Sequence, residues 1–536
     1  GNYKKEDLQQ FRQWGSVTPG HPEVDVLRGI ENTSGPLGQG HTMGVGAAIA
    51  AKFLDARFKG LFEHKIYGFI TDGGVQEEIS QGAGRIAGHL GLNNFIMFYD
   101  SNDVQLSSMT DEVTSENTAM KYEAWGWKVI TIDGHDHTQI RKALSEAHEE
   151  LERPTLIIGK TIMGKGCVTA TGAMYEGECE LHGKPIGDTK ADYVKTLLNL
   201  KANPERPFDI YEEVEKHYTK IKALKVEKSA TKKTQIASWK KENPVLSLKL
   251  ELFLSGEIPD LDLSSVVLKP NVATREASST VLAYLAEKVE NMIVSSADLS
   301  NSDKTDGFLK KSSVLQKNDF SGAFLQAGVA ELTMTSIANG IALHGGVIPV
   351  VATFFVFSDY MKPAIRLAAI QELPVKYVWT HDSFRVGEDG PTHQPIEQEA
   401  QIRLMEKIKN HSGNQSLLAL RPADAVETSV AWDMALKNTK TPTGLILSRQ
   451  NIQDIPAQGT SRYEEATEAS KGGYLVKSTQ NPDITLIANG SEVATLLAAA
   501  VLLEKEKNLK INVASIISEG LFKEQSKSYQ ESIIPK

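Results

Sequence analysis

Two apolar runs early in the chain are each followed by residues that could bind a cation. Asp72 and Gly73 follow Ile66–Ile70, and Asn102 follows Phe95–Tyr99, 30 residues (102 − 72) after Asp72. Parallel strands end at the same edge of a sheet, so these groups are expected to meet there. Carboxylate, amide and main-chain oxygens suit Mg²⁺ or Ca²⁺ carrying a diphosphate, and glycine lets a phosphate approach the backbone. Two ordinary turns rich in Asp, Asn and Gly remain the alternative.

Two later segments carry ionisable side chains without an evident structural need. His381 follows the apolar run Val375–Trp379, and the loop Gly387–Pro395 holds Asp389 and His393. Two histidines and a carboxylate beyond strand ends suit proton transfer and the recognition of hydroxyl and carbonyl oxygens. We favour this functional interpretation over that of polar loops with no special role.

Three aromatic residues and one glutamate suggest a place for a flat ring. Phe354, Phe357 and Tyr360 are spaced by three residues, which puts them on one face if the segment is helical. Such a stripe is usually core, but it could also wall a heteroaromatic ring. Glu331 lies at the start of an apolar helix expected over Val329–Leu343. Its carboxyl group could stay protonated, hold a heterocycle nitrogen, or simply favour the helix N-terminus.

These residues need a scaffold of strands and helices. Apolar runs alternate with helical patterns through most of the chain, which predicts an α/β protein with parallel sheets flanked by helices. The expected strands are Ile66–Ile70, Phe95–Tyr99, Val129–Ile132, Leu156–Ile158, Met292–Ser295, Val347–Thr353, Val375–Trp379, Leu417–Leu420, Gly444–Leu447, Ile484–Ala488 and Val513–Ile517. The expected helices include Glu77–Leu90, His137–Leu151, Glu331–Leu343 and Glu492–Glu504.

A break in this alternation predicts the domain organisation. Residues 200–265 are rich in Lys and Glu and are interrupted by Pro204, Pro207 and Pro244, as in a connection between domains. We therefore expect a first domain over 1–205, a linker over 206–268, a second domain over 269–455 and part of a third over 456–536. The Lys-rich stretch Lys216–Lys241 is interpreted as a solvated, partly helical linker rather than a binding patch.

The composition excludes several classes of protein. A formal net charge of −10 argues against a nucleic-acid partner. There is no apolar run of about eighteen residues, so no membrane span is expected, and the first residues do not resemble a secretory signal. Cys167 and Cys179 are the only cysteines, which argues against a disulfide framework or a zinc site and fits a reducing cytoplasm.

Taken in order, these motifs resemble transketolase, a family of thiamine-diphosphate enzymes that move two-carbon ketol units between sugar phosphates. The match runs from about residue 18 to about residue 517, nearly the whole chain. Its most specific parts are Gly387–Pro395 and Leu447–Asn451. The stretch from Asp72 to Asn102 resembles the thiamine-diphosphate signature of the family.

The resemblance implies a cofactor site in two parts. Asp72, Asn102 and the carbonyl of Val104 would bind the divalent cation, Mg²⁺ or Ca²⁺. The other implied cofactor-binding residues are Gly35, Leu37, Gly73, Glu77, His182, Glu331, Phe354, Phe357 and Tyr360. Glu331 would hydrogen-bond the ring nitrogen and favour the imino tautomer, while the cofactor supplies the carbanion chemistry. The first domain of one subunit and the second of another would share the cofactor, which implies a homodimer with active sites at the subunit interface.

The resemblance also implies the substrate and the reaction. The implied sugar-phosphate residues are His21, His182, Arg275, Ser302, His381, Asp389, His393 and Arg449. Glu331 and the four histidines of that set would be catalytic, and the planar fork of arginine suits a phosphate. The expected reaction is reversible ketol transfer (EC 2.2.1.1) from a ketose phosphate such as xylulose 5-phosphate to an aldose phosphate such as ribose 5-phosphate, in the pentose phosphate pathway.

The chain departs from the family pattern at a few positions. Thr71 replaces a usual glycine, Gly74 a usual cysteine, Ser295 and Ser296 two usual glycines, and Ala330 the arginine before the glutamate. The family's opening histidines and most of its C-terminal domain are not matched, so we expect a chain truncated at both ends. Dihydroxyacetone synthase, deoxyxylulose-phosphate synthase and a non-catalytic cofactor-binding fragment needing a partner chain remain alternatives; the candidate phosphate-binding residues favour phosphosugar donors.

Overall fold

The computed structural model describes residues 2–58, 60–459 and 461–535. The chain divides into two compact units. Unit 1 comprises Gly1–Ala48 and Phe58–Glu251, and unit 2 comprises Ile49–Arg57 and Leu252–Lys536. Helix α2 (Gln39–Phe58) therefore contributes residues to both units.

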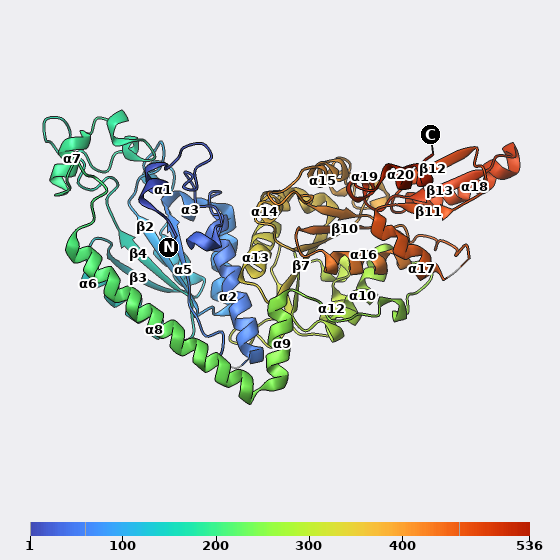
Figure 1. Ribbon diagram of the computed structural model, residues 1–536, viewed down its shortest axis with the longest axis horizontal. Coiled ribbons are helices and arrows are strands. Elements are labelled where there is room, and N and C mark those ends of the chain that lie inside the picture. The colour runs from blue at the N-terminus through green and yellow to red at the C-terminus, as the bar shows by residue number, and fades with distance from the viewer. Residues whose placement is uncertain (1, 59, 460, 536) are drawn as a thin grey trace. The chain divides into compact units, whose positions relative to one another are not determined.

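The sheet of unit 1 has four parallel strands in the order β1-β2-β4-β3 (Figure 1). They are β1 (Ile66–Thr71), β2 (Phe95–Ser101), β3 (Lys128–Asp133) and β4 (Thr155–Lys160). All four strands predicted in this part of the chain are present, and β1 and β2 extend one to two residues further than expected. In the register of β1 and β2, Thr71 lies opposite Asp100. The residues that follow these two strands therefore emerge side by side.

The helices of unit 1 follow the predicted alternation with one break. They are α1 (Lys5–Gln9), the first part of α2, α3 (Asp72–Gln76), α4 (Glu78–Leu90), α5 (Thr118–Ala124), α6 (His137–Glu149), α7 (Tyr193–Asn199) and α8 (Glu212–Glu242). The helix predicted from Glu77 begins at Glu78, because the backbone of Glu77 between α3 and α4 is not helical, with φ of −56° and ψ of 134°. Ile96, Ile132 and Ile157 of the sheet pack against Ala143 and Ala147 of α6.

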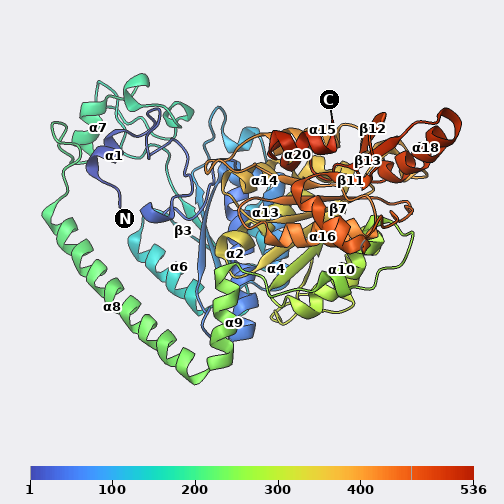
Figure 2. The same ribbon diagram turned by 45° about the vertical axis from the view of Figure 1, so that its right-hand side comes forward.

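The Lys-rich stretch forms a single helix rather than a partly helical linker. Helix α8 runs unbroken (Figure 2). It spans 31 residues, and none of them is buried. Its first turn is acidic and its last turn basic, as the helix dipole favours. Local propensity and charge therefore maintain much of this helix, and near its end the Trp239 ring lies 6.4 Å from that of Phe58.

The main sheet of unit 2 has six parallel strands in the order β6-β5-β7-β8-β10-β9. They are β5 (Met292–Ser296), β6 (Phe324–Gln326), β7 (Ile348–Phe354), β8 (Lys376–Thr380), β9 (Leu418–Leu420) and β10 (Thr443–Leu447). Five of the six were predicted; β6 was not, because only two of its three residues are apolar. The nearly continuous apolar runs of β7, β8 and β10 reflect burial on both faces of a parallel sheet.

Helices flank this sheet. They are α9 (Pro244–Ser255), which spans the boundary between the units in the chain, and α10 (Thr274–Lys288), α11 (Ser300–Asp303), α12 (Asp306–Leu309), α13 (Glu331–His344), α14 (Ser358–Ile370), α15 (Gln398–Lys407), α16 (Ala425–Lys437) and α17 (Arg462–Ala466). Helix α13 is the apolar helix predicted from Glu331.

The last part of unit 2 carries a small mixed sheet in the order β11-β13-β12 (Figure 1). Strands β12 (Ile484–Ala488) and β13 (Ile511–Ser515) are parallel, and β11 (Tyr474–Lys477) pairs antiparallel with β13. Helix α18 (Glu492–Lys507) connects β12 to β13, and α19 (Glu519–Lys523) and α20 (Lys527–Ile533) follow. The antiparallel β11 was not predicted, and β13 begins two residues before the expected strand. Within the described residues, no helix is both long and apolar enough to cross a membrane.

Candidate active site

The carboxyl ends of β1 and β2 bring Asp72 and Asn102 together. The Asp72 side chain is buried, with 3% of the residue exposed. The backbone N–H of Asn102 donates to Asp72 Oδ2 at 3.0 Å, and that of Asp103 donates to the same oxygen at 3.2 Å. Tyr99 Oη donates to Asp72 Oδ1 at 2.6 Å. The register of the two strands thus places the predicted oxygen ligands at one edge of the sheet.

The turn after β2 orients its remaining oxygens. Asn102 Oδ1 accepts the backbone N–H of Val104 at 3.1 Å, and Asn102 Nδ2 donates to Asp100 Oδ1 at 3.3 Å. Asp103 adopts a left-handed backbone with φ of 64°, which turns the chain at this point. Among the described residues no cluster of three or more His, Cys, Asp or Glu could hold a metal. The expected ligands are of another kind, namely one carboxylate, one amide and one carbonyl, and this oxygen set fits Mg²⁺ or Ca²⁺.

Several predicted cofactor residues of unit 1 lie against one another. A Cβ on Gly73 would meet Leu37 Cδ1 at 3.4 Å, and a Cβ on Gly35 would meet His21 Cβ at 3.1 Å. Gly38, with φ of 80°, would place a Cβ 2.9 Å from that of Glu77. The glycine-rich loop is therefore packed directly onto the start of α3 and the break before α4.

Arg12 connects the loops that carry His21 and His182. Its Nη1 donates to the carbonyl of Gly183 at 3.3 Å, and its Nε lies 3.3 Å from a Cβ built on Gly20. His182 Nδ1 is buried without a hydrogen-bond partner among the described residues. A buried nitrogen of this kind is suited to a ligand that supplies the missing partner.

In unit 2 the three aromatic rings form a stack. Phe354 ends β7, Phe357 ends a 3₁₀ turn, and Tyr360 lies in α14. The ring centroids of Phe354 and Phe357 are 6.1 Å apart, and those of Phe357 and Tyr360 are 5.9 Å apart, with 16° between the planes in both cases. A strand end and a tight turn produce this stack, rather than the single helical face considered from the sequence. Tyr360 is 61% exposed, so the outer end of the stack is open.

Glu331 lies near the same strand end. It is the first residue of α13 and is 9% exposed. Thr353 Oγ1, one residue before Phe354, donates to Glu331 Oε1 at 3.3 Å. The carboxyl group is thus held by Thr353 at the end of β7, and the residue after Thr353 is Phe354 of the aromatic stack.

His381 sits at the centre of the predicted substrate residues. In the register of β7, β8 and β10, Thr380 lies opposite both Phe354 and Leu447, so the residue after it is flanked by both neighbouring strand ends. The His381 ring stacks on Phe354 with centroids 3.7 Å apart. Its Nδ1 is 2.9 Å from Thr380 Oγ1.

Two arginines approach this histidine. Arg275 Nη1 lies 3.4 Å from His381 Nε2 and donates to the carbonyl of Ser302 at 2.8 Å. Ser302 therefore contributes its carbonyl, not its hydroxyl, to the contact with Arg275. Burial first, and then the charges of Arg275 and Arg449, lower the pKa of His381 to about 3.

The remaining predicted residues line the surroundings. Arg449 forms an ion pair with Glu388, a neighbour of Asp389 in the Gly387–Pro395 loop. Burial lowers the pKa of Arg275, and the charge of Asp389 opposes that shift. The His393 ring meets Phe357 edge-on at 5.3 Å. Unit 2 thus gathers cationic, histidine and aromatic side chains at one edge of its sheet.

Sequence reasoning missed the residues that hold these groups in place. Tyr99 was included only as the end of a strand, and Thr353 only as part of an apolar run. Tyr99 lies opposite Ile70 in the register of β1 and β2, and its hydroxyl reaches the Asp72 that follows β1. Only the strand neighbours, which spacing along the chain does not reveal, could have identified Tyr99.

Models of three protein families match the chain in order. Residues 2–259 match the transketolase thiamine diphosphate binding domain, residues 270–454 the transketolase pyrimidine binding domain, and residues 472–536 a transketolase-like C-terminal domain. With the parallel sheets described above, these matches define an α/β protein of the thiamine-diphosphate-binding fold.

Known relatives agree with this class. A transketolase of Halalkalibacterium halodurans is 40% identical over 540 residues, which cover 99% of this chain and 78% of the relative. The solved structure of a transketolase from Leishmania mexicana is 34% identical with a TM-score of 0.91, covering 100% of this chain and 77% of the other. A Pichia stipitis transketolase solved in complex with sedoheptulose 7-phosphate is 34% identical with a TM-score of 0.88, covering 99% and 77%.

The chain belongs to the transketolase family. Its function is the transfer of a two-carbon ketol unit between sugar phosphates (EC 2.2.1.1), and its cofactor is thiamine diphosphate.

Proposed function

We propose that this enzyme takes the ketol unit from a ketose phosphate such as xylulose 5-phosphate and gives it to an aldose phosphate such as ribose 5-phosphate. The observation that carries this proposal is the contact of Arg275 with both His381 and the Ser302 carbonyl beside the Phe354 ring. A guanidinium offers several fixed donors that suit a phosphate. The sugar phosphate bound by the Pichia stipitis relative supports the same class of ligand.

His381 would recognise a sugar hydroxyl as a neutral imidazole. Arginine can only donate, so Nε2 of His381 accepts from Arg275 and Nδ1 carries the proton toward Thr380. A low pKa of about 3 keeps this form at neutral pH. Nε2 can then exchange its contact with Arg275 for a substrate hydroxyl, while Arg275 turns to the phosphate. Arg449 would likewise exchange Glu388 for the phosphate, and Asp389, Ser302 and His393 would contact the sugar.

The cofactor ring would be held by the aromatic stack and by Glu331. The stack of Phe354, Phe357 and Tyr360 offers flat, partly exposed faces, and Glu331 accepts a hydrogen bond from Thr353, the residue before Phe354. When bound, thiamine diphosphate supplies the carbanion chemistry of the reaction. Glu331 would hold a proton between its carboxyl group and the pyrimidine ring. The residues proposed to meet the cofactor from unit 1 are Gly35, Leu37, Gly73, Glu77 and His182, with His21 and His182 also facing the substrate.

A divalent cation, Mg²⁺ or Ca²⁺, would bind Asp72, Asn102 and the carbonyl of Val104. The support for this is the hard-oxygen donor set assembled at the ends of β1 and β2.

Assembly, domain limits and cellular role form part of the same proposal. The diphosphate residues and the pyrimidine residues belong to different compact units, and we propose that two subunits pair them in a homodimer. The proposed domains are 1–205, 269–455 and 456–536, with a linker over 206–268 that contains α8. We propose that the enzyme acts in the pentose phosphate pathway of the cytoplasm; the two free cysteines agree with that reducing compartment.

The test is a donor comparison on one preparation with thiamine diphosphate and Mg²⁺. Ketol transfer from xylulose 5-phosphate to ribose 5-phosphate is expected, and no product from pyruvate. Turnover with pyruvate alone would support the deoxyxylulose-phosphate synthase alternative and reject our substrate assignment. Sedimentation with and without cofactor tests the dimer, and a monomer under turnover conditions would reject the shared site.

A further inference from the structure

A buried polar network holds Asp382, the residue that follows His381 in the chain. Arg421, the first residue after β9, donates through Nε and Nη2 to Asp382 Oδ2 at 3.1 and 2.8 Å. Asp382 is 4% exposed and Arg421 5% exposed. Strand β10 lies between β8 and β9 in the sheet. Arg421 therefore extends past the end of β10 to bind Asp382, the residue next to His381.

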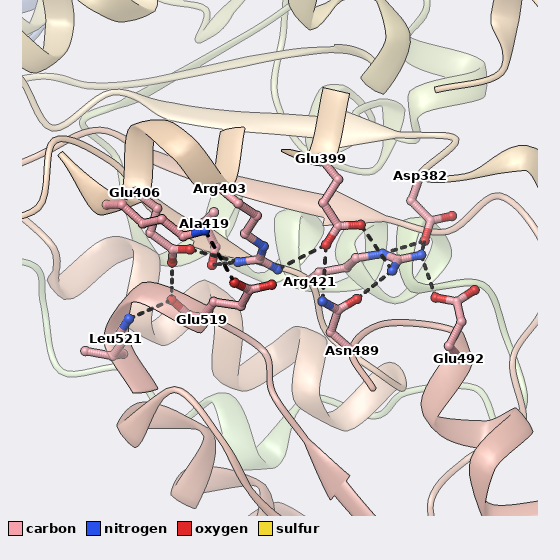
Figure 3. A network of polar contacts seen from close by, with 12 residues as sticks. Asp382, Glu399, Arg403, Glu406, Ala419, Arg421, Asn489, Glu492, Glu519 and Leu521 are labelled. Atoms are coloured by element: carbon pink, nitrogen blue, oxygen red, sulfur yellow. Dashed lines mark hydrogen bonds and ion pairs between the residues drawn. The ribbon is translucent and has the colours of Figure 1, made fainter. Parts of the chain in front are cut away.

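The other side of Arg421 is held by the last part of the chain. Its Nη1 donates to Asn489 Oδ1 at 2.5 Å, and its Nη2 lies 2.7 Å from Glu492 Oε2 at the start of α18. Figure 3 shows the guanidinium between Asp382 on one side and Asn489 and Glu492 on the other. The backbone takes part as well, because the N–H of Gly490 donates to the Arg421 carbonyl at 3.1 Å.

The residues packed around Arg421 leave its guanidinium little space to move. A Cβ on Gly490 would lie 2.6 Å from Arg421 Nε, and its φ of 55° is one that glycine adopts readily. Glu399 of α15 adds a contact of 3.4 Å to Arg421 Nη1 and accepts from Asn489 Nδ2 at 3.1 Å. The guanidinium therefore has a partner on each side and one preferred position.

The residue that this network holds in place, Asp382, is next to a residue with a strained backbone, His381. His381 has a left-handed backbone with φ of 61°, which is uncommon for a residue other than glycine. Such a conformation persists only where the surroundings over-determine it. The hydrogen bonds from Arg421 to Asp382 provide that constraint at the residue directly after His381.

We propose that Arg421 is a positioning residue for His381, and that Asn489 and Glu492 make the small C-terminal sheet and its helix α18 part of the active-site support. The proposal rests on the substrate role of His381 proposed above. The small C-terminal sheet and α18 would thus support substrate binding without contacting the sugar themselves.

Unit 2 contains a matched control for this proposal. Arg462 is likewise a poorly exposed arginine with two buried carboxylates, pairing with Asp424 at 2.9 Å and with Glu427 at 3.4 Å. Tyr474 of β11 donates to Glu427 at 2.6 Å, so this network also ties the small sheet to another part of unit 2, helix α16. None of its members is adjacent to His381 in the sequence. Arg462→Gln therefore removes a comparable contact without reaching the histidine.

The test combines kinetics with a direct signal from the ring. The full chain is labelled with ¹³C at histidine Cε1, and the resonance lost in His381→Asn is assigned to His381. Arg421→Gln is expected to shift that resonance and to raise KM for xylulose 5-phosphate by about 10- to 100-fold, the range for a misplaced binding group. Arg421→Lys should recover part of both effects. Glu492→Gln, which removes a single partly exposed partner, should show the same direction to a smaller extent if Arg421→Gln does not fold.

The outcomes separate the possible explanations. Arg462→Gln should lower the melting temperature while leaving the His381 resonance and KM unchanged. If Arg421→Gln, or Glu492→Gln in its place, leaves both unchanged, or if Arg462→Gln shifts them equally, the positioning role is overturned. A shifted resonance with an unchanged KM would uphold the positioning of His381 and reject its proposed role in substrate binding.

Discussion

The guanidinium of Arg275 points at the imidazole of His381, with 3.4 Å between Nη1 and Nε2. Two groups that can both be cationic approach closely only when one of them is neutral. Burial and the nearby arginines lower the pKa of the histidine to about 3, so the imidazole carries no charge at physiological pH. The pair therefore presents one cation and one hydrogen-bond acceptor at a single point, which supports the proposed contact with a phosphorylated sugar.

Replacing Arg275, the cation of this pair, should weaken the binding of the phosphate much more than the binding of the sugar hydroxyls. Arg275→Leu is expected to raise KM for a phosphorylated ketose by about 10- to 100-fold, because a charge-assisted hydrogen bond contributes about 1.5–3 kcal/mol. KM for a ketose donor without phosphate should change much less. Steady-state kinetics with both donors measures the difference. Equal losses for the two donors would contradict a phosphate contact.

The hydroxyl of Tyr99 should matter for the cation. Tyr99→Phe removes the 2.6 Å hydrogen bond to Asp72 while keeping the ring. We expect Mg²⁺ activation to weaken by about 5- to 10-fold, since one hydrogen bond contributes about 1 kcal/mol. Titration of activity with Mg²⁺ at saturating thiamine diphosphate measures this effect. Tyr67→Phe is the control, because Tyr67 is 52% exposed and its hydroxyl contacts only His148 among the described residues.

The carboxyl group of Glu331 should be needed for cofactor activation but not for folding. Glu331→Ala is expected to melt cooperatively near the wild-type temperature and to lose at least about 100-fold in kcat, the lower range for general acid–base catalysis. Thr353→Val, which removes the donor 3.3 Å from Glu331, should lose less. Full activity of Glu331→Ala would refute the role assigned to it.

His41 should make the protein less stable in acid. Burial lowers the pKa of His41 from 6.5 to about 4. The unfolded chain takes up this proton first, so the stability contributed by neutral His41 is complete above pH 6.5 and is lost as the pH falls toward 4. His41→Phe should therefore reduce the loss of unfolding free energy across that range by about 1–3 kcal/mol.

Urea denaturation at pH 7.5 and pH 4.5 measures the His41 effect. The exposed His137 provides the control, and His137→Gln should keep the wild-type dependence on pH. Identical pH dependence in His41→Phe and wild type would show that His41 is accessible to protons in the folded state.

Much of the scaffold was predictable because its signals are local. The buried strands of parallel sheets are short apolar runs, and β1, β2, β7, β8 and β10 were found for this reason. Asp72 and Asn102 could be paired in advance, since each follows such a run and parallel strands end at one edge. The short β6 and the antiparallel β11 were missed, because their three and four residues each end in a polar one and are too few to establish a period. The equally short β9 was found because it lies in the wholly apolar run Leu417–Leu420.

By itself the sequence determined the α/β class and which residue types stand at the strand ends, since these follow from spacing along one chain. Its motifs also resemble one family, transketolase. Only the tertiary structure decided which of those residues meet. Strand order and register put His381 beside Phe354, turned Tyr99 toward Asp72, and let Arg421 reach Asp382 across β10. The physical reason is that contacts between strands depend on crossover connections and pairing, which bring together residues 27 to 39 positions apart.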